Sequence, residues 1–540
     1  MQSNSSSFTS QSIGFLGEPP KPNAHEHIYD ICIVGSGASG SIAAAEFVKA
    51  GLDVVLLEQG PFLTSKISYD DILRASESAY VRQDNGTWGL TGYPWTTCNV
   101  GGGTVFYGGA SFRYRNVDFD ASKYYSGADL SLSWPYNYSE IAQYYDEIED
   151  MIGVAGFPSM DPTTPDGYIS APLPPVELSL EGKLISEAAK KLGLNPFPTP
   201  LAITTKPYKK RPKCSSESAC IEQMCTRGSK GDVYTVILKS LQNHSNFSLY
   251  AGVKAIQLSR KSRDNISHIL CKRVDSGEEF IFKARFFIVA CNAIQSAALL
   301  LRSSDTFSPN GIGNENDMVG RGLCFKMSEY VVGYLDNSVK KGKSEHKLDN
   351  NKRRGGAFST VSLTDYYLAS ECPTGLGGLI YESKYGFPYS LSDMESILRL
   401  ECLVADEPVH RNRVMLSSDT DDLGIPRIIL DYQAHPRDIV RLEYMVERSK
   451  EILKEAGCKW IKRENSGWQQ GSGHLHGTCR AGKDPRKSVL DSNSKVHTVN
   501  NLYVIDGSFM PYPGSVNPTL TIQAHALRAA RKLINLIKST

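Results

Sequence analysis

The segment between Tyr29 and Gly60 constrains the fold of this chain more than any other. It holds an apolar run, a glycine-rich turn, a stretch of small residues with helical character, and a second apolar run that ends in glutamate. Gly35, Gly37 and Gly40 occupy the three positions of G-x-G-x-x-G. Glycine there permits a tight turn, close approach of a phosphate to the backbone, and close packing of the helix on the strand. The pattern predicts a βαβ unit with a nucleotide pyrophosphate at the helix N-terminus.

Two further features of this unit concern the nucleotide. Ala38 and Ser39 would begin the helix and offer backbone N–H groups to the phosphates. Glu58 ends the second strand, where a carboxylate can accept hydrogen bonds from both ribose hydroxyls and disfavours a 2′-phosphate. FAD and NAD share this fingerprint, and an ordinary glycine turn before a helix gives the same letters. The turn alone leaves these alternatives open.

Composition narrows the class of protein. The 540 residues exceed one compact core, so we expect two joined domains. The 59 basic and 58 acidic side chains give a formal net charge of +1, which offers no electrostatic footprint for nucleic acid. No apolar run approaches the ~20 residues that span a bilayer, and residues 1–27 form a polar arm unlike a signal peptide. Twelve cysteines, mostly isolated in apolar runs, suit reduced thiols in a cytoplasmic protein.

Strand-like and helix-like patterns alternate, and nucleotide-binding character returns at the start, middle and end of the chain. The predicted fold is α/β, with α+β character overall: a discontinuous Rossmann-like domain and an inserted substrate domain built on an antiparallel sheet with helices. The Rossmann-like domain would comprise 28–125, 246–330 and 471–540, and the substrate domain 126–245 and 331–470. We expect helices over 139–156, 180–193, 293–302, 438–457 and 517–538, and one sheet that includes 330–335, 377–383 and 427–433.

Two segments near the C-terminus decide between the nucleotides. They read HLHGTCRAG at 474–482 and LYVIDGSFMPYPGSVNPTLTIQAHA at 502–526. With the N-terminal turn, they resemble the glucose-methanol-choline (GMC) family of FAD-dependent alcohol oxidoreductases. The resemblance continues through nearly the whole chain in the family's order, at 101–109, 134–156, 288–301, 311–323 and 411–432. It implies that the Rossmann-like domain binds FAD.

The resemblance assigns catalytic roles to two residues. In the family, the first histidine of H-x-x-G-T-C and a histidine or asparagine of the closing segment flank flavin N5; these positions are His474 and Asn517 here. Oxidation of an alcohol requires removal of the hydroxyl proton as hydride leaves carbon, and imidazole, with an ordinary pKa of roughly 6.5, suits a base near neutrality. We predict that His474 is the base and that Asn517 orients the substrate hydroxyl.

The resemblance also implies contacts to FAD. Asp506 and Gly507 would meet the pyrophosphate and the ribityl chain. Pro518 and Thr519 would begin the last helix, whose N-terminal amides could stabilise negative charge at flavin N1 and O2. Asn517 could also cap this helix, and the two interpretations are compatible. The other implied contacts are Gly102, Gly103, Val253 and Cys291.

Some family members attach FAD covalently through a histidine in the glycine loop. Phe106 occupies that place here and has no nucleophilic nitrogen, so we expect noncovalent FAD. His476 lies two residues after His474 and would point to the opposite face of an extended segment. It is either a second catalytic histidine or a packed one. His525, on the last helix, is interpreted as structural.

The cluster of Cys214, Cys220 and Cys225 has two interpretations. It resembles a cysteine-rich segment in a bacterial branch of the family, where some members hold an iron-sulfur cluster, and three thiolates could ligate three irons. The C-x5-C-x4-C spacing is looser than the usual C-x2-C runs, and there is no adjacent fourth cysteine. Buried thiols or a disulfide are the alternatives.

The expected function is FAD-dependent oxidation of an alcohol group to a carbonyl, with hydride transfer to flavin N5. Within the family, the His–Asn pair and the GTCR motif look closest to members that act on sugars, polyols and sugar-containing metabolites. These include aminoglycoside oxidases of antibiotic biosynthesis, which convert a primary hydroxymethyl group to an aldehyde. The electron acceptor could be oxygen, a dye, a quinone or a protein. The alternatives are an NAD-linked dehydrogenase and a noncatalytic flavin electron-relay protein.

Overall fold

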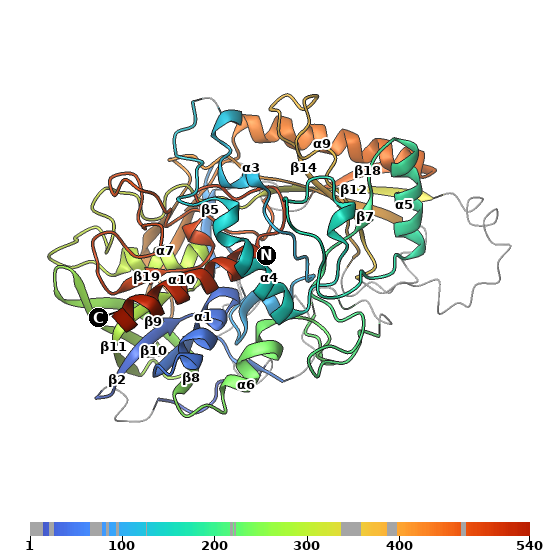
Figure 1. The fold of residues 1–540 in the computed structure, drawn as a ribbon. Helices are drawn as coiled ribbons and strands as arrows, with labels where there is room; N and C mark the ends of the chain where they lie inside the picture. The colour runs from blue at the N-terminus through green and yellow to red at the C-terminus, as the bar shows by residue number, and fades with distance from the viewer. Residues whose placement is uncertain are drawn as a thin grey trace.

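Four β-sheets and the helices around them make up the part of the chain that the structure describes (Figure 1). The computed structural model describes residues 14–20, 26–64, 78–82, 86–92, 97–125, 127–215, 220, 223–335, 358–385, 397–465 and 471–539. The α-helices are α1 (Ala38–Lys49), α3 (Asn116–Phe119), α4 (Tyr138–Ile152), α5 (Leu180–Lys191), α6 (Lys239–Leu241), α7 (Asn292–Arg302), α9 (Pro436–Glu455) and α10 (Thr519–Ser539). The smallest sheet pairs β1 (Gly14–Phe15) with β4 (Phe62–Leu63).

The largest sheet is mixed and carries the nucleotide turn. Its strand order is β8 (Phe247–Ala251), β3 (Val54–Glu58), β2 (Ile28–Val34), β11 (Glu279–Val289), β10 (Asn265–Arg273) and β9 (Val253–Ser262), with β19 (Leu502–Val504) also paired to β11. The first four strands run parallel, and β10 and β9 are antiparallel to their neighbours. β3 is buried along its whole length, as parallel strands covered on both faces are.

Strand β11 brings three distant parts of the chain together. Its first half is antiparallel to β10, where Glu279 lies opposite Lys272. Its second half runs parallel to β19, where Val289 lies opposite Val504. β2 pairs with the same strand, so that Val34 also lies opposite Val289. The carboxyl ends of β2, β11 and β19 therefore meet at one edge of the sheet, where ligands of open α/β sheets bind.

A six-stranded antiparallel sheet lies next to this unit. Its order is β18 (Cys458–Asn465), β12 (Met327–Leu335), β15 (Ile397–Val404), β14 (Gly378–Glu382), β13 (Val361–Leu363) and β7 (Phe197–Pro198). α9 packs on it, along the top of Figure 1, and buries Leu442, Met445 and Val446 at helical spacing. His435 caps α9 by accepting a hydrogen bond from the Arg437 N–H, and Pro436 takes the first helical position.

The expected sheet membership of residues 427–433 is wrong. They fall largely in β17 (Pro426–Asp431), which belongs to a separate four-stranded sheet in the order β16 (Arg413–Thr420), β17, β5 (Ser78–Arg82) and β6 (Trp88–Gly92). β17 pairs in parallel with β5, more than 300 residues away in the chain. An alternating apolar pattern specifies a strand but not its partner, because both sheets bury one face.

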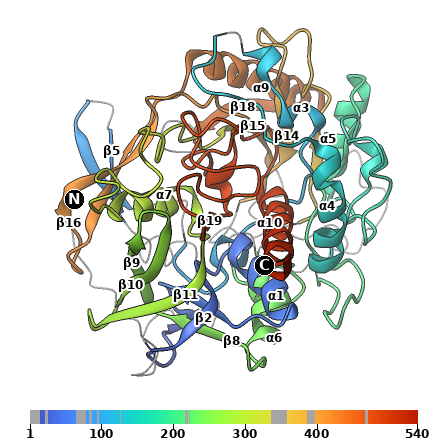
Figure 2. The same ribbon diagram turned by 60° about the vertical axis from the view of Figure 1, so that its left-hand side comes forward.

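The long helices fall where the sequence predicts them. α4, α5, α7, α9 and α10 confirm the five expected helices within a few residues at each end. Asn137 caps α4 by accepting a hydrogen bond from the Glu140 N–H, and Gly153 ends it with a φ of 71°. α10 packs against α1 and α4, so the C-terminal helix lies beside the first helix of the nucleotide turn (Figure 2).

The α/β fold class is confirmed, while the domain boundaries remain a prediction. In the glycine-rich stretch at 101–109, Gly102–Val105 forms one turn of 3₁₀ helix. Most of the predicted N-terminal arm lies outside the described residues. None of the helices in the described ranges combines the length and the hydropathy that crossing a membrane requires.

Candidate active site

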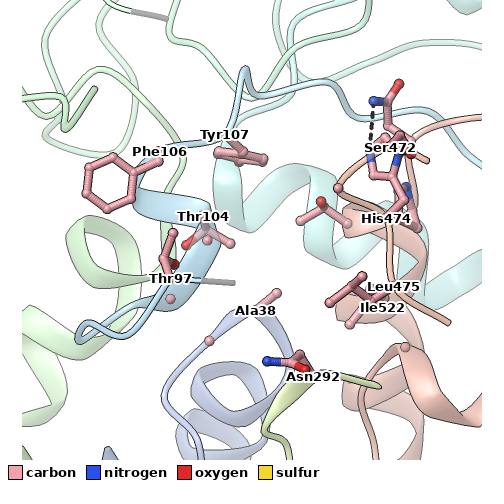
Figure 3. Close-up of a pocket in the computed structure, with 18 of the residues that line it drawn as sticks. Ala38, Thr97, Thr104, Phe106, Tyr107, Asn292, Ser472, His474, Leu475 and Ile522 are labelled. Atoms are coloured by element: carbon pink, nitrogen blue, oxygen red, sulfur yellow. Dashed lines mark hydrogen bonds between the residues drawn. The ribbon is translucent and has the colours of Figure 1, made fainter. Parts of the chain in front are cut away.

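A cavity of about 1070 Å³ lies between the largest sheet and the six-stranded sheet. In Figure 3, Ser472, His474 and Leu475 face Phe106 and Tyr107 across it. Of the sixteen predicted catalytic and FAD-binding residues, all but Gly40 line this cavity: Gly35, Gly37, Ala38, Ser39, Glu58, Gly102, Gly103, Val253, Cys291, His474, Asp506, Gly507, Asn517, Pro518 and Thr519. Residues far apart in the sequence thus converge on one site.

A different steric constraint explains each of the three glycines in the turn. A Cβ on Gly35, which has a φ of 99°, would lie 2.4 Å from the Ala290 carbonyl oxygen. A Cβ on Gly40 would lie 1.9 Å from the Gly35 oxygen, so Gly40 shapes the turn from beneath without lining the cavity. A Cβ on Gly37 would meet nothing within 4 Å. Gly37 therefore leaves its backbone open to a ligand.

Glu58 and the glycine loop are tied to this turn. The Glu58 carboxylate accepts hydrogen bonds from the Ser36 N–H at 3.0 Å, the Ser36 hydroxyl at 2.7 Å and the Gly60 N–H at 2.9 Å. The Gly101 N–H donates to the same Ser36 hydroxyl oxygen at 3.0 Å. Burial raises the pKa of Glu58, and these hydrogen bonds act in the opposite direction. The carboxylate is thereby held at the cavity wall.

Three helices direct their N-termini towards the cavity. Ala38 begins α1, Asn292 begins α7 and Thr519 begins α10, and all three residues line it. The dipoles of the three helices favour negative charge there, although in α7 the Ile294 and Gln295 N–H groups already donate to Asn292 Oδ1. The predicted cap of α10 is wrong, since Asn517 Oδ1 is buried and accepts no hydrogen bond in the structure. The first amides of α10 therefore stay available to a ligand.

The imidazole of His474 is fixed in one orientation. Its Nδ1 lies 2.7 Å from the Ser472 hydroxyl oxygen, and that hydroxyl donates to the Phe325 carbonyl at 2.7 Å. Ser472 must therefore accept a hydrogen bond from Nδ1–H, which leaves the lone pair on Nε2. Burial lowers the pKa of His474 well below 6.5, and the Lys326 ammonium group lowers it further. The ring is held in its neutral form.

Asn517 belongs to a chain of side chains on the cavity wall. Its Nδ2 lies 3.3 Å from His474 Nε2. The amide also forms a hydrogen bond that lowers the pKa of Tyr381, against the larger effect of burial. The Tyr381 hydroxyl donates to Glu401. The donor atom of the Asn517 amide is thus directed at the lone pair of His474.

The other histidines of the closing segments lie away from the cavity lining. His476 is completely buried, and neither ring nitrogen has a hydrogen-bond partner. His525 lies 2.8 Å from the Tyr136 hydroxyl through Nδ1 and 2.8 Å from the Ser494 hydroxyl through Nε2, and it stacks on Phe509. The arrangement favours the structural interpretation of His525 and the packed interpretation of His476.

The three clustered cysteines do not gather into a ligand set. All twelve cysteines of the chain carry free thiols, so the disulfide alternative is wrong. Cys214 and Cys220 pack against an apolar cluster that contains Leu201, Ile203 and Phe358. Within the described ranges, no three histidine, cysteine or acidic side chains are placed to hold a metal. The cysteine spacing alone could not show this, because it does not fix where the loop folds.

Sequence patterns did not reveal four residues of the site. Ser472 orients His474, Lys326 lies near both closing histidines, and Tyr381 and Glu401 extend the chain from Asn517. Tyr381 and Glu401 lie on paired strands β14 and β15, directly opposite each other. The only available signal was a polar pair in otherwise apolar strands, which is common at cavity walls.

The site fits a flavin nucleotide. The turn offers open backbone at Gly37, three helix N-termini face the cavity, and Asn517 Oδ1 and Thr97 Oγ1 are buried polar atoms of the lining without a partner. Gly102 lies so close to Gly37 that a Cβ on it would reach the Gly37 Cα at 2.8 Å. The two glycine-rich segments therefore form one continuous cradle.

Comparison with known families decides the class. Sequence models described as GMC oxidoreductase match residues 78–328 and 408–526, and one described as NAD(P)-binding Rossmann-like domain matches residues 33–73. The chain belongs to the GMC oxidoreductase family. As a GMC oxidoreductase it is an FAD-dependent enzyme that oxidises alcohols. The NAD-linked and noncatalytic alternatives are not supported.

Two relatives match over most of their length. The chain is 44% identical to 6'''-hydroxyparomomycin C oxidase of Streptomyces lividus, over 95% of this chain and 92% of the relative. It is also 44% identical to paromamine 6'-oxidase of Streptomyces fradiae, over 94% and 91%. Among solved structures, pyridoxine 4-oxidase from Mesorbium loti has a TM-score of 0.64 at 19% identity, covering 93% of this chain and 99% of that one. The structural likeness supports the fold.

Gly35→Ala should impair FAD binding. The Cβ would collide with the Ala290 carbonyl and force the turn away from the pyrophosphate, so we expect protein that folds but purifies with little flavin. Gly51→Ala is the matched control, since Gly51 also has a positive φ, 84°, but faces open space. Flavin absorbance per protein measures the effect. Equal flavin content in the two variants would contradict the steric assignment.

Proposed function

We propose that this GMC oxidoreductase oxidises a primary hydroxymethyl group of an aminoglycoside or related amino sugar to an aldehyde. Two relatives that are 44% identical over more than nine-tenths of the chain support this, because both are named as oxidases of aminoglycosides. The observation that carries the chemistry is the approach of Asn517 Nδ2 to His474 Nε2, at 3.3 Å. One atom can donate a hydrogen bond and the other can accept a proton.

A substrate hydroxyl oxygen would sit beside both atoms and replace the direct contact between them. Its oxygen would accept a hydrogen bond from Asn517 Nδ2, and its proton would pass to His474 Nε2. Ser472 fixes the ring through Nδ1, so the lone pair stays directed at the hydroxyl. When FAD is bound, it accepts the hydride that leaves the carbinol carbon. His474 therefore acts as base, and Asn517 orients the substrate.

The cofactor would be held by the cradle and the helix N-termini. Gly37, Ala38 and Ser39 would face the pyrophosphate, Glu58 the ribose, and the first amides of α10 the flavin N1 and O2. The other predicted contacts that line the cavity would complete the binding site, with Gly40 packed behind the turn: Gly35, Gly102, Gly103, Val253, Cys291, Asp506, Gly507, Pro518 and Thr519. The protein would bind FAD noncovalently, because Phe106 lines the cavity at the place of the attachment histidine.

The wall opposite the cradle is polar and carries carboxylates together with the cations Lys384 and Arg399. Strands β14 and β15 place Glu382 and Glu401 in the cavity lining, together with Tyr381. Carboxylate oxygens accept hydrogen bonds from ammonium and hydroxyl groups alike. Burial raises the pKa of Glu382 to about 7, and the neighbouring Lys384 opposes that rise. An amino sugar offers the donors that such a wall requires.

His474→Ala should retain FAD and lose turnover. Loss of a general base costs about 10²- to 10⁴-fold, so the flavin of the variant should bleach slowly with paromamine under anaerobic conditions. The wild-type protein should bleach readily, and faster than with glucose, which has the hydroxymethyl group but no amine. His268→Ala, on the far strand β10, is the matched control. Admission of air then shows whether oxygen accepts the electrons.

Two outcomes of that titration would count against the proposal. If neither paromamine nor glucose bleaches the wild-type flavin, the substrate assignment is wrong. If paromamine bleaches His474→Ala as fast as wild type, the base is another group.

The rate of flavin reduction should decline only at low pH. His474 removes a proton only while Nε2 is unprotonated, and its pKa lies well below 6.5 because of burial and of Lys326. Activity should therefore persist as the pH falls to 6.5 and decline only below it, at saturating paromamine. The measurement is the limiting rate of anaerobic bleaching against pH. A midpoint above 6.5 would exclude a neutral, buried His474 as the base.

FAD should leave the protein on denaturation. No covalent bond to the glycine loop is possible at Phe106, so acid precipitation should release all flavin into the supernatant. Absorbance of the pellet and of the supernatant measures the partition. Yellow flavin that stays with the washed pellet would show covalent attachment by another residue.

A further inference from the structure

Lys326 is an unusual residue to find in the centre of this molecule. It directly precedes β12, has a φ of 54°, and its side chain is completely buried. An ammonium group that leaves water costs free energy unless polar groups satisfy it. Its Nζ donates to the Val516 carbonyl oxygen and, at 3.2 Å, to the Tyr114 hydroxyl oxygen. The Lys326 side chain therefore binds the segment before Asn517 directly at Val516 and, through the Tyr114 hydroxyl, at Pro513.

That segment has no regular structure of its own. Residues 513–517 lie between a 3₁₀ turn and α10 and form no backbone ladder. Side chains from other elements hold them instead. The Tyr114 hydroxyl donates to the Pro513 carbonyl, and the Ser515 N–H donates to the Tyr367 hydroxyl oxygen at 2.8 Å. Lys326 supplies the contact at Val516, the residue next to Asn517.

Two buried carboxylates accompany the lysine. Asp406 accepts a hydrogen bond from the Lys326 backbone N–H at 3.0 Å, and the Tyr367 hydroxyl donates its one proton to the Asp118 carboxylate, whose two oxygens both lie 2.8 Å away. Burial lowers the pKa of Lys326 well below its usual range, and the attraction of Asp118 and Asp406 opposes that shift only in part. The amine keeps an N–H to donate to the Val516 carbonyl in either protonation state, so this contact does not depend on the charge.

We propose that Lys326 is a positioning residue that holds Asn517 in place for the substrate hydroxyl. It touches neither the substrate hydroxyl nor the flavin; it acts through the Val516 carbonyl. This inference rests on the role of Asn517 in the proposed function. A carbonyl fixed next to Asn517 sets where the amide lies, and misplacement of a reacting or orienting group by about 1 Å can cost about 10²-fold in rate.

A double-mutant cycle tests the proposal in the FAD-loaded enzyme. We expect Lys326→Met to lower the limiting rate of anaerobic flavin bleaching by paromamine about tenfold to a hundredfold, with unchanged flavin content. Because Lys326 acts through Asn517, the same change in an Asn517→Ala background should cost little more. Arg260→Met is the control, since Arg260 is a buried cation that pairs with Asp305 outside the cavity lining. It should bleach at the wild-type rate.

If Lys326→Met does not fold, Tyr114→Phe provides a second test of the proposal. It retains the ring but removes the hydroxyl that accepts from Lys326 and donates to Pro513. A smaller loss of rate, again absent in the Asn517→Ala background, supports the proposal.

The outcomes separate this inference from the proposed function. The role of Lys326 alone is overturned if the two losses of bleaching rate multiply fully in the double variants. It is also overturned if Lys326→Met bleaches at the wild-type rate. A wild-type rate in Asn517→Ala overturns the orienting role of Asn517, and the inference falls with it.

Discussion

The parallel ladder between β11 and β19 determines where the chain from Asp506 to α10 can lie. Only three residue pairs form it, from Phe287–Leu502 to Val289–Val504. Because β19 and β2 both run parallel to β11, the chain after β19 leaves the sheet at the same edge as the glycine turn after β2. Asp506, two residues beyond this ladder, therefore reaches the cavity, and α10 follows beside α1. The glycine turn near the N-terminus and the segment that leads to Asn517 near the C-terminus meet because β2 and β19 share the partner strand β11.

Much of this arrangement could be predicted from residue patterns, and the failures have physical causes. The glycine turn and the long helices follow from spacing and periodicity, because steric and periodic constraints act locally. Most of the fifteen predicted residues of the cavity wall follow instead from the resemblance to the GMC family. Tyr381 and Glu401 could not be predicted, since they meet through pairing of β14 with β15 and approach Asn517 only after the sheet has formed. The partner of β17 was missed for the same reason.

Asn517 shows how tertiary contacts override a local preference. An asparagine before proline at a helix start favours the capping position, where its side-chain oxygen would accept a backbone N–H. Here the amide nitrogen is drawn to His474 and Tyr381, and Oδ1 is left buried without a partner. An unsatisfied buried acceptor costs about 1–3 kcal/mol. Such a cost is typical of a group kept for a ligand, and the free amides of α10 add a second site for negative charge.

The two large sheets contribute different parts of the cavity lining. The mixed sheet and its turn supply the cradle, in which Gly35, Gly40 and Gly102 cannot carry a side chain because their close approaches involve backbone. The six-stranded sheet supplies side chains such as Tyr381 and Glu401, which project into the cavity without altering the strand backbone. Substitutions there change the polarity of the wall at little cost to the fold. A GMC oxidoreductase can thus change the alcohol it accepts while His474 and Asn517 keep their places.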